Sequence, residues 1–114
     1  MFARIVTMPL KPGSTSEYAK ATEKDVIPLL RKHKGFMDQM GLVTADGKSA
    51  LGISLWDSKE SAEAYSRSGY ADVMKALDKV VAGPAQLQLC EVTNSTAHKI
   101  AAALAAGASP VSRS

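Results

Sequence analysis

The chain has 114 residues, of which 46% are hydrophobic and 22% are charged, and this composition fits one globular domain with one core. Its formal charge of +3 is small and its basic residues are spread along the chain, which argues against a nucleic-acid-binding face. The single cysteine excludes an intrachain disulfide and a cysteine-based metal motif.

Basic residues cluster only at 31–34, where a predicted helix ends and cations complement the helix dipole. The two histidines are far apart in the sequence, so we expect no metal site. The N-terminus lacks the apolar run of a signal peptide, and the apolar stretch near Ala101 is far shorter than the ~20 residues that cross a bilayer. We therefore expect a cytoplasmic protein without nucleic-acid or membrane partners.

The first strand is predicted at residues 2–8, which are rich in β-branched and apolar side chains. Ser14 and Glu17 then have the spacing of a capping box, which predicts that a helix begins there. Pro28 lies inside this helix and predicts a kink near Lys24, because proline has no backbone N–H to donate.

A β-hairpin is predicted to follow this helix. Gly35 is placed as a left-handed cap of the helix, with Phe36 packing back against it. Residues 36–44 and 49–56 are predicted as two strands, and Asp46-Gly47 between them is a strong signal for the connecting turn.

The strand predicted at 49–56 has two faces that both lack charge. An antiparallel strand with one solvated face normally alternates apolar with polar residues. Both faces are therefore predicted to be covered, one by helices and the other by something else. One face carries Leu51, Ile53 and Leu55, and the other carries Ala50, Gly52, Ser54 and Trp56.

The second helix is predicted to begin at Asp57, which has capping-box spacing with Glu60, and Gly69 interrupts it. An apolar stripe at helical spacing continues over 70–81 and is closed by Gly83-Pro84. A fourth strand is predicted at 86–92.

The predicted order is β-α-β-β-α-β, an α+β ferredoxin-like fold with an antiparallel sheet and both helices on one face. It occupies residues 1–93. Residues 94–114 are an Ala-rich C-terminal extension, in which we predict a short helix capped at Asn94 and a partly disordered tail over 107–114. A second copy of the same sheet is a natural cover for the open face, so we predict a homodimer.

The chain resembles the antibiotic biosynthesis monooxygenase superfamily of dimeric α/β barrels over residues 2–92. The features that carry the resemblance are Gly35-Phe36, the hairpin, Trp56 at the end of the third strand, and residues 57–65 at the start of the next helix. The family includes cofactor-independent oxygenases acting on aromatic polyketides or quinols, haem-degrading enzymes, and members with no assigned reaction. The resemblance implies the dimeric barrel. The sequence has no cysteine or histidine cluster for a metal and no Gly-rich loop that opens a helix, so an oxygenase reaction is expected to use no metal or cofactor.

The functional residues of the family are matched only in part. In the polyketide-oxidising branch, the strand tryptophan matches Trp56, but an Asn of that branch falls on Gly52 and a Tyr falls on Ala62. The haem-degrading branch has an Asn, a Trp and an iron-ligating His, which fall at or near Val6, Tyr65 and Lys75.

Three residues are candidates for catalysis. The indole of Trp56 can stack on an aromatic substrate and donate one hydrogen bond, while Tyr65 or His33 can handle protons. As structural alternatives, Trp56 anchors the junction of strand and helix, and His33 is a cation at a helix C-terminus. Four further residues are predicted to bind substrate in an apolar pocket: Tyr70, Met74, Val26 and Tyr18.

The leading hypothesis is a cofactor-independent monooxygenase acting on a small aromatic or quinone-like substrate. The alternative is a non-catalytic dimeric module of the same fold, which binds a small hydrophobic ligand or serves in a stress response. A third hypothesis is haem binding or degradation, for which His33 is the plausible axial ligand.

Overall fold

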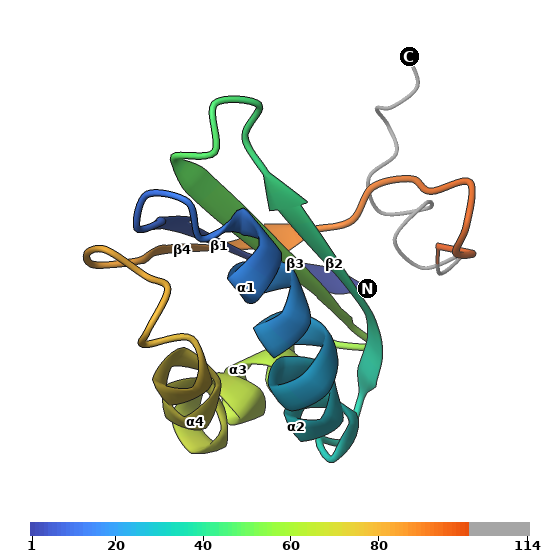
Figure 1. The fold of residues 1–114 in the computed structure, drawn as a ribbon. Helices are drawn as coiled ribbons and strands as arrows, with labels where there is room; N and C mark the ends of the chain where they lie inside the picture. The colour runs from blue at the N-terminus through green and yellow to red at the C-terminus, as the bar shows by residue number, and fades with distance from the viewer. Residues whose placement is uncertain (101–114) are drawn as a thin grey trace.

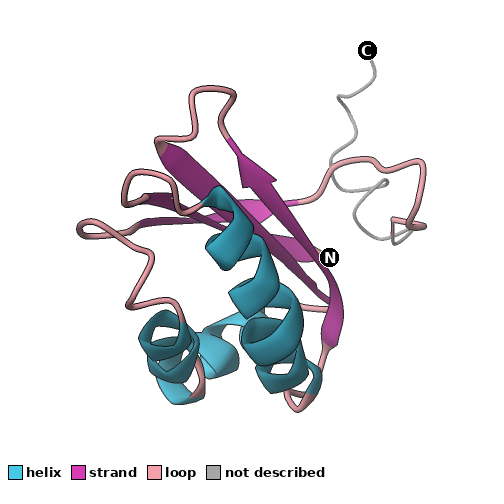
Figure 2. Cartoon of the chain, viewed as in Figure 1, coloured by secondary structure: helices cyan, strands magenta, loops and turns pink. Residues whose placement is uncertain are grey.

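The computed structural model describes residues 1–100, which form one antiparallel sheet with all the helices on one of its faces (Figures 1 and 2). The chain order confirms the predicted α+β ferredoxin-like fold. The elements are β1 (Phe2–Pro9), α1 (Thr15–Ala21), the π-helical turn η1 (Thr22–Val26), α2 (Ile27–Arg31), β2 (Phe36–Val43), β3 (Ser49–Trp56), α3 (Lys59–Ser68), α4 (Tyr70–Ala76) and β4 (Gln86–Glu91).

The sheet has the strand order β2-β3-β1-β4, and every neighbouring pair is antiparallel. Val6 on β1 lies opposite Gly52 on β3 and Leu87 on β4. Directly paired residues share a face of the sheet, and side chains alternate along each strand. The face toward the helices therefore carries the even-numbered residues of β1 and β3, and the open face carries the odd-numbered ones.

The first helical region runs through α1, η1 and α2. It begins at Thr15 after Ser14, as predicted. The predicted capping bond is absent, since the Ser14 hydroxyl accepts no hydrogen bond from the first turn of the helix. The π-helical turn of η1 surrounds Lys24, where Pro28 predicted a distortion. Since Pro28 cannot donate to the Lys24 carbonyl, the wider turn absorbs the missing bond.

Gly35 has the positive φ that its position predicted, at 85°. It lies in the turn between α2 and β2 rather than directly at the end of the helix. A Cβ at this position would overlap the side chains of Ser61 and Asp57, so the close approach of the α3 N-terminus also requires glycine.

The second helical region differs from its prediction at both ends. Ser58, not Asp57, is the N-cap, and its hydroxyl accepts a hydrogen bond from the Ser61 amide at 3.1 Å. Gly69 separates α3 from α4, as predicted. The apolar stripe predicted a helix to 81, but α4 ends at Ala76 because the following backbone pairs with the end of β1, where Ala82 N–H donates to the Pro9 carbonyl.

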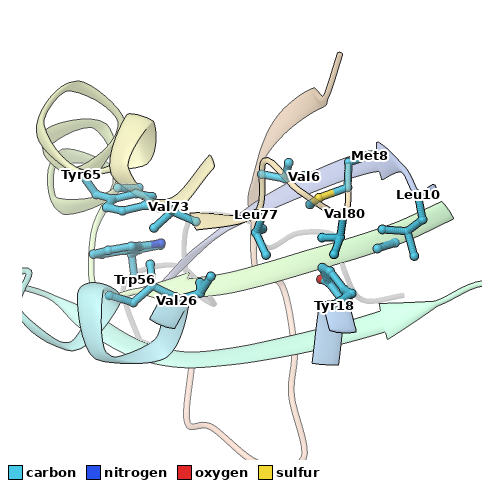
Figure 3. Packing of buried hydrophobic residues seen from close by; sticks show 13 residues of the cluster. Val6, Met8, Leu10, Tyr18, Val26, Trp56, Tyr65, Val73, Leu77 and Val80 are labelled. Atoms are coloured by element: carbon cyan, nitrogen blue, oxygen red, sulfur yellow. The ribbon is translucent and has the colours of Figure 1, made fainter. Parts of the chain in front are cut away.

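The hydrophobic core fills the space between the sheet and the helices (Figure 3). Trp56 is the largest fully buried side chain. Tyr65 lies beside it at one end of the cluster, and Leu10 lies at the other end. The remaining buried members of the cluster are Val6, Met8, Tyr18, Val26, Leu30, Ala50, Ala62, Val73, Leu77 and Val80.

The open face of the sheet has an apolar centre that none of the helices within residues 1–100 covers. On β2, Met40 is 57% exposed and Leu42 is 41% exposed. The odd-numbered residues of β3 are half-buried, as is Ile5 of β1. Along β3, side chains that face the helices therefore alternate with side chains on the open face, as predicted. That a second copy of the chain covers the open face stays a prediction.

Residues 92–100 contain no helix or strand. Ser95 Oγ accepts hydrogen bonds from the backbone N–H groups of Ala97 and His98, and His98 Nε2 lies 3.1 Å from Asp38 Oδ2 on β2. The helix predicted from Asn94 is not formed up to residue 100, and the rest of that prediction lies outside the described residues. Within residues 1–100, every helix is too short or too polar to cross a bilayer.

Candidate functional site

A cavity lies between the helix-facing side of the sheet and the helices. It contains about 420 Å³ that protein atoms do not fill, part of it open to solvent. The enclosed part of this space has a volume of about 40 Å³. Apolar and aromatic walls with a few polar groups are typical of small-molecule sites. Its lining residues are Arg4, Val6, Met8, Tyr18, Thr22, Val26, Leu30, Gln39, Gly52, Ser54, Tyr65, Tyr70, Val73, Met74 and Leu77.

An aromatic cluster forms one end of the cavity. Trp56 stacks on Tyr65 with ring centroids 4.9 Å apart and planes 23° from parallel. Tyr70 meets Tyr65 edge-on, with centroids 6.4 Å apart, and Phe36 meets Trp56 edge-on from β2 at 5.6 Å. Figure 3 shows the Trp56 and Tyr65 rings packed face to face. This cluster fixes the position of Tyr65, because each ring in it is held by another.

The Trp56 indole is connected to the cavity by its hydrogen bond to Ser54. Trp56 is fully buried and does not line the cavity, and its Nε1–H donates to Ser54 Oγ at 2.9 Å. The indole donor expected for a substrate is therefore already in use. Ser54 does line the cavity, and a hydroxyl that accepts one bond keeps its own proton to donate.

Tyr65 is a proton donor and not a base at neutral pH. Burial raises the pKa of its hydroxyl to about 12, although the nearby Arg4 guanidinium opposes the shift. Burial also raises the pKa of Tyr18. Both phenols therefore keep their protons across the physiological range and can donate hydrogen bonds to a ligand oxygen.

His33 lies outside the cavity, on the far side of Tyr65. It meets the Tyr65 ring edge-on at 5.1 Å and packs against Gly69, where a Cβ would overlap the imidazole. It lines a separate surface groove with Lys34 and Asp57. Tyr65 lines both the groove and the cavity, so it separates His33 from the cavity interior.

The residues predicted from the sequence are thus partly brought together. Tyr65 lines the cavity, Trp56 supports it from behind, and His33 is separated from it. The four residues predicted to bind substrate all line the cavity, and their role in binding stays a prediction: Tyr70, Met74, Val26 and Tyr18.

Four polar lining residues were not predicted from the sequence, namely Arg4, Thr22, Gln39 and Ser54. Arg4 is only 2% exposed, and its Nε–H donates to Ser66 Oγ on α3 at 2.9 Å. The Gln39 side-chain nitrogen lies 4.0 Å from the point that a Cβ of residue 52 would occupy. A carboxamide is therefore present beside Gly52, where the polyketide-oxidising branch has its Asn, but it comes from β2.

Within residues 1–100, no group of three or more His, Cys, Asp and Glu side chains is placed to hold a metal ion. The lining residues of the cavity also include no carboxylate. The expectation of a site without metal therefore stays a prediction, and the candidate chemistry depends on phenol, hydroxyl, amide and guanidinium groups.

Comparison with solved structures identifies proteins of the same fold. The chain superposes on the ActVA-Orf6 monooxygenase of Streptomyces coelicolor, solved with nanaomycin D, with a TM-score of 0.67 and 21% identity over 82% of this chain and 88% of that one. It superposes on SnoaB, a cofactor-independent oxygenase of Streptomyces nogalater, with a TM-score of 0.64 and 14% identity over 85% and 97% of the two chains. It superposes on a proposed antibiotic biosynthesis monooxygenase of Nitrosomonas europaea with a TM-score of 0.65 and 19% identity over 82% of this chain and 100% of that one.

The chain therefore has the fold of the antibiotic biosynthesis monooxygenase proteins, as the sequence resemblance implied. A protein of unknown function from Nitrosomonas europaea matches equally well, with a TM-score of 0.68 and 17% identity over 89% of this chain and 94% of that one. No protein-family model matches the sequence, and no curated protein matches it. At these identities the likeness establishes the fold and leaves the reaction open.

Proposed function

We propose that this protein is a monooxygenase that uses no metal or organic cofactor and acts on a small aromatic or quinone-like substrate. The substrate is held in the cavity beside Tyr65 and Tyr70. The observation that carries the proposal is this largely apolar, aromatic chamber on a fold shared with two oxygenases, one of them cofactor-independent. One of those two was solved with nanaomycin D, which supports an aromatic or quinone-like ligand here.

In such a reaction the substrate supplies every electron. When a ring CH₂ of an anthrone-like substrate becomes a carbonyl, one atom of O₂ becomes the carbonyl oxygen and the other leaves as water with the two hydrogens. The substrate must first lose a proton to solvent, because its enolate gives up electrons to oxygen far more readily, and protons return when the second oxygen atom leaves as water. The protein has to hold the substrate, exclude water and stabilise the enolate oxygen.

The cavity has donors for that enolate oxygen. Ser54 is held by the Trp56 indole, so its hydroxyl proton is oriented before substrate arrives. Tyr65 keeps its proton because burial raises its pKa to about 12. Gln39 adds a carboxamide beside Gly52. In this assignment Ser54 and Tyr65 contact substrate, and Trp56 is a positioning residue.

Oxygen uptake tests the proposal. Purified protein is mixed with a panel of anthrones and hydroquinones in an oxygen electrode, with and without EDTA and without added reductant. We expect protein-dependent uptake with at least one anthrone, unchanged by EDTA. Uptake no faster than the chemical background for every substrate would refute oxygenase activity, and loss of uptake in EDTA would refute the metal-free mechanism.

A non-catalytic ligand-binding module is the second candidate, because this chain has Gly52 and Ala62 where the polyketide-oxidising branch has functional residues. Ligand binding in the cavity without oxygen uptake would support it. Haem binding is a third reading, and His33 packs against Gly69 and Tyr65 outside the cavity. We therefore expect added haemin to give no protein-dependent shift of its Soret band.

We further propose that the protein is a homodimer joined through the open face of the sheet. The apolar centre of that face is bordered by polar residues, Asp38 on β2 and Gln88 on β4, as in a typical interface with an apolar core and a polar rim. A two-fold interface needs only one self-complementary patch. Light scattering at micromolar concentration should give twice the chain mass, and a monomer would refute the dimeric barrel.

A further inference from the structure

A buried arginine lies in the wall of the cavity. Arg4 belongs to β1, faces the helices and is 2% exposed. Its guanidinium carbon lies 4.8 Å from the centre of the Tyr65 ring and 4.6 Å from that of the Tyr70 ring. Together with the bond from Nε to Ser66, these contacts hold the guanidinium plane in one place.

This guanidinium is incompletely satisfied. Arg4 Nη2 is buried and has no hydrogen-bond partner among the described residues. Within residues 1–100, no carboxylate forms an ion pair with Arg4 either. Burial lowers the pKa of Arg4, and the Tyr65 and Tyr70 hydroxyls oppose that shift, but an arginine side chain keeps its charge in proteins. A buried charge without a partner is costly, so its presence calls for an occupant.

The rest of the lining agrees with an anionic occupant. Among residues 1–100, the lining of the cavity holds no carboxylate and Arg4 is its one charged group. The buried Thr22 hydroxyl also lines the cavity and lies near the Tyr18 hydroxyl, so it adds a neutral polar group to the lining. The other walls are mainly apolar or aromatic and suit a ring.

We propose that the cavity binds a small aromatic anion, whose ring lies against the apolar walls and whose negatively charged oxygen accepts a hydrogen bond from Arg4 Nη2. The anionic group is an aromatic carboxylate or the phenolate of an acidic phenol. This inference rests on the proposed function and gives it a substrate class. In a substrate whose phenol ionises on binding, the proton leaves to solvent and Arg4 stabilises the remaining charge.

A matched pair of ligands tests the proposal in the unmodified protein. 2-Naphthoate and 2-naphthamide share one ring system and nearly one shape, and differ in charge. Trp56 is the only tryptophan, so its single indole N–H resonance in ¹⁵N-labelled protein reports on the cavity through Ser54. We expect 2-naphthoate to bind at least about tenfold more tightly than 2-naphthamide, a difference of ~1.4 kcal/mol. Equal affinity, or no binding of either, would overturn the proposal.

Three variants assign the effect to one residue. Arg4→Met keeps the unbranched apolar stem and removes the charge, so we expect it to lose the preference for 2-naphthoate while binding 2-naphthamide as before. Arg4→Lys keeps a charge without the planar fork and should retain part of the preference. Arg67→Met is the matched control, since Arg67 is an exposed arginine on α3 beside Ser66. Its preference should equal that of the wild type.

Melting curves show whether each variant folds. If Arg4→Met is folded and keeps the full preference for 2-naphthoate, Arg4 does not bind the carboxylate of the ligand and the proposal is wrong. If Arg4→Met does not fold, the affinities of Arg4→Lys and the wild type for the two ligands are compared instead. Lysine has no planar guanidinium, so an unchanged preference for 2-naphthoate in Arg4→Lys would refute the bond from Nη2. Because 2-naphthoate is not a substrate for oxidation here, its binding can succeed or fail independently of oxygen uptake.

Discussion

Filling the cavity from Gly52 should separate stability from function. Gly52 lies at the middle of β3 and its hydrogen points into the cavity. A Cβ built there would come no closer than 3.9 Å to any heavy atom outside its immediate chain neighbours, with the Tyr18 hydroxyl nearest. The variant Gly52→Val therefore adds three carbons to empty space without a clash at Cβ, and valine suits a strand better than glycine.

The expected gain in stability can be estimated from two contributions. Burying each added carbon is worth ~0.8 kcal/mol, and glycine in a strand costs ~0.5–1 kcal/mol relative to alanine. The polar neighbours Tyr18 and Gln39 reduce the first contribution, so we expect a net gain of about 1–2 kcal/mol. For a domain of this size, a gain of that order raises the melting temperature by at least about 4 °C.

The same valine occupies the space that a substrate needs, so ligand affinity and oxygen uptake should each fall at least about tenfold. Gly41→Ala is the control. Gly41 pairs with Gly52 across β2 and β3 but does not line the cavity, and its Cβ would meet the Tyr18 hydroxyl at an ordinary 3.5 Å. A Gly52→Val protein that keeps wild-type uptake would show that the reaction takes place elsewhere, and a lower melting temperature would show that the cavity is not empty.

Three further predictions concern the dimer, the indole and the buried phenol. Ile53→Glu puts a charge at the centre of the open face and should give a monomer by light scattering, while Gln88→Glu at the rim stays dimeric; a dimeric Ile53→Glu protein would contradict the sheet-to-sheet interface. Trp56→Phe removes the donor to Ser54, so it should lower the unfolding free energy by about 1–3 kcal/mol and slow turnover several-fold, and equal turnover would leave Trp56 a purely structural role. Folding raises the pKa of Tyr65 from 10.0 to about 12, so its contribution to stability is complete below pH 10 and is lost as pH rises toward 12, by about 2–3 kcal/mol in total. Denaturant unfolding across that range measures the loss, and tyrosinate absorbance of the native protein that titrates fully near pH 10 would contradict it.

Several features of the fold followed directly from the sequence. The third strand, the left-handed glycine at 35 and the break at Gly69 each depend on local chemistry, and the structure confirms all three. The end of α4 did not follow, because a long-range pairing with β1 competes with the helical pattern. A local pattern has no information about such a partner.

The polar residues of the cavity show the same limit. An arginine in a strand is normally read as solvent-facing, but Arg4 has the same parity as Val6 and Met8, and this signal could have placed it on the helix side. Ser54 shares the parity of Trp56 in the same way. Gln39 could not be placed, because a register shift between Phe36 and Asp38 changes which residues of β2 face the helices.

The position of His33 depends on where the helix ends. The sequence predicted His33 at the C-terminus of the helix, but α2 ends at Arg31 and His33 lies in the turn that follows. Val26 and Leu30, which precede that end, both line the cavity. Pro28 predicted where the helix would be disturbed, but not where it would end.

In the proposed function, the protein transfers an atom of O₂ to a substrate held in the cavity. Incubation of the protein with an anthrone under ¹⁸O₂, followed by mass spectrometry of the product, tests it most directly. We predict one heavy oxygen atom in the newly formed carbonyl, at a rate that depends on the protein and falls in Gly52→Val. A carbonyl without label, or label incorporated as fast without the protein, would contradict the claim.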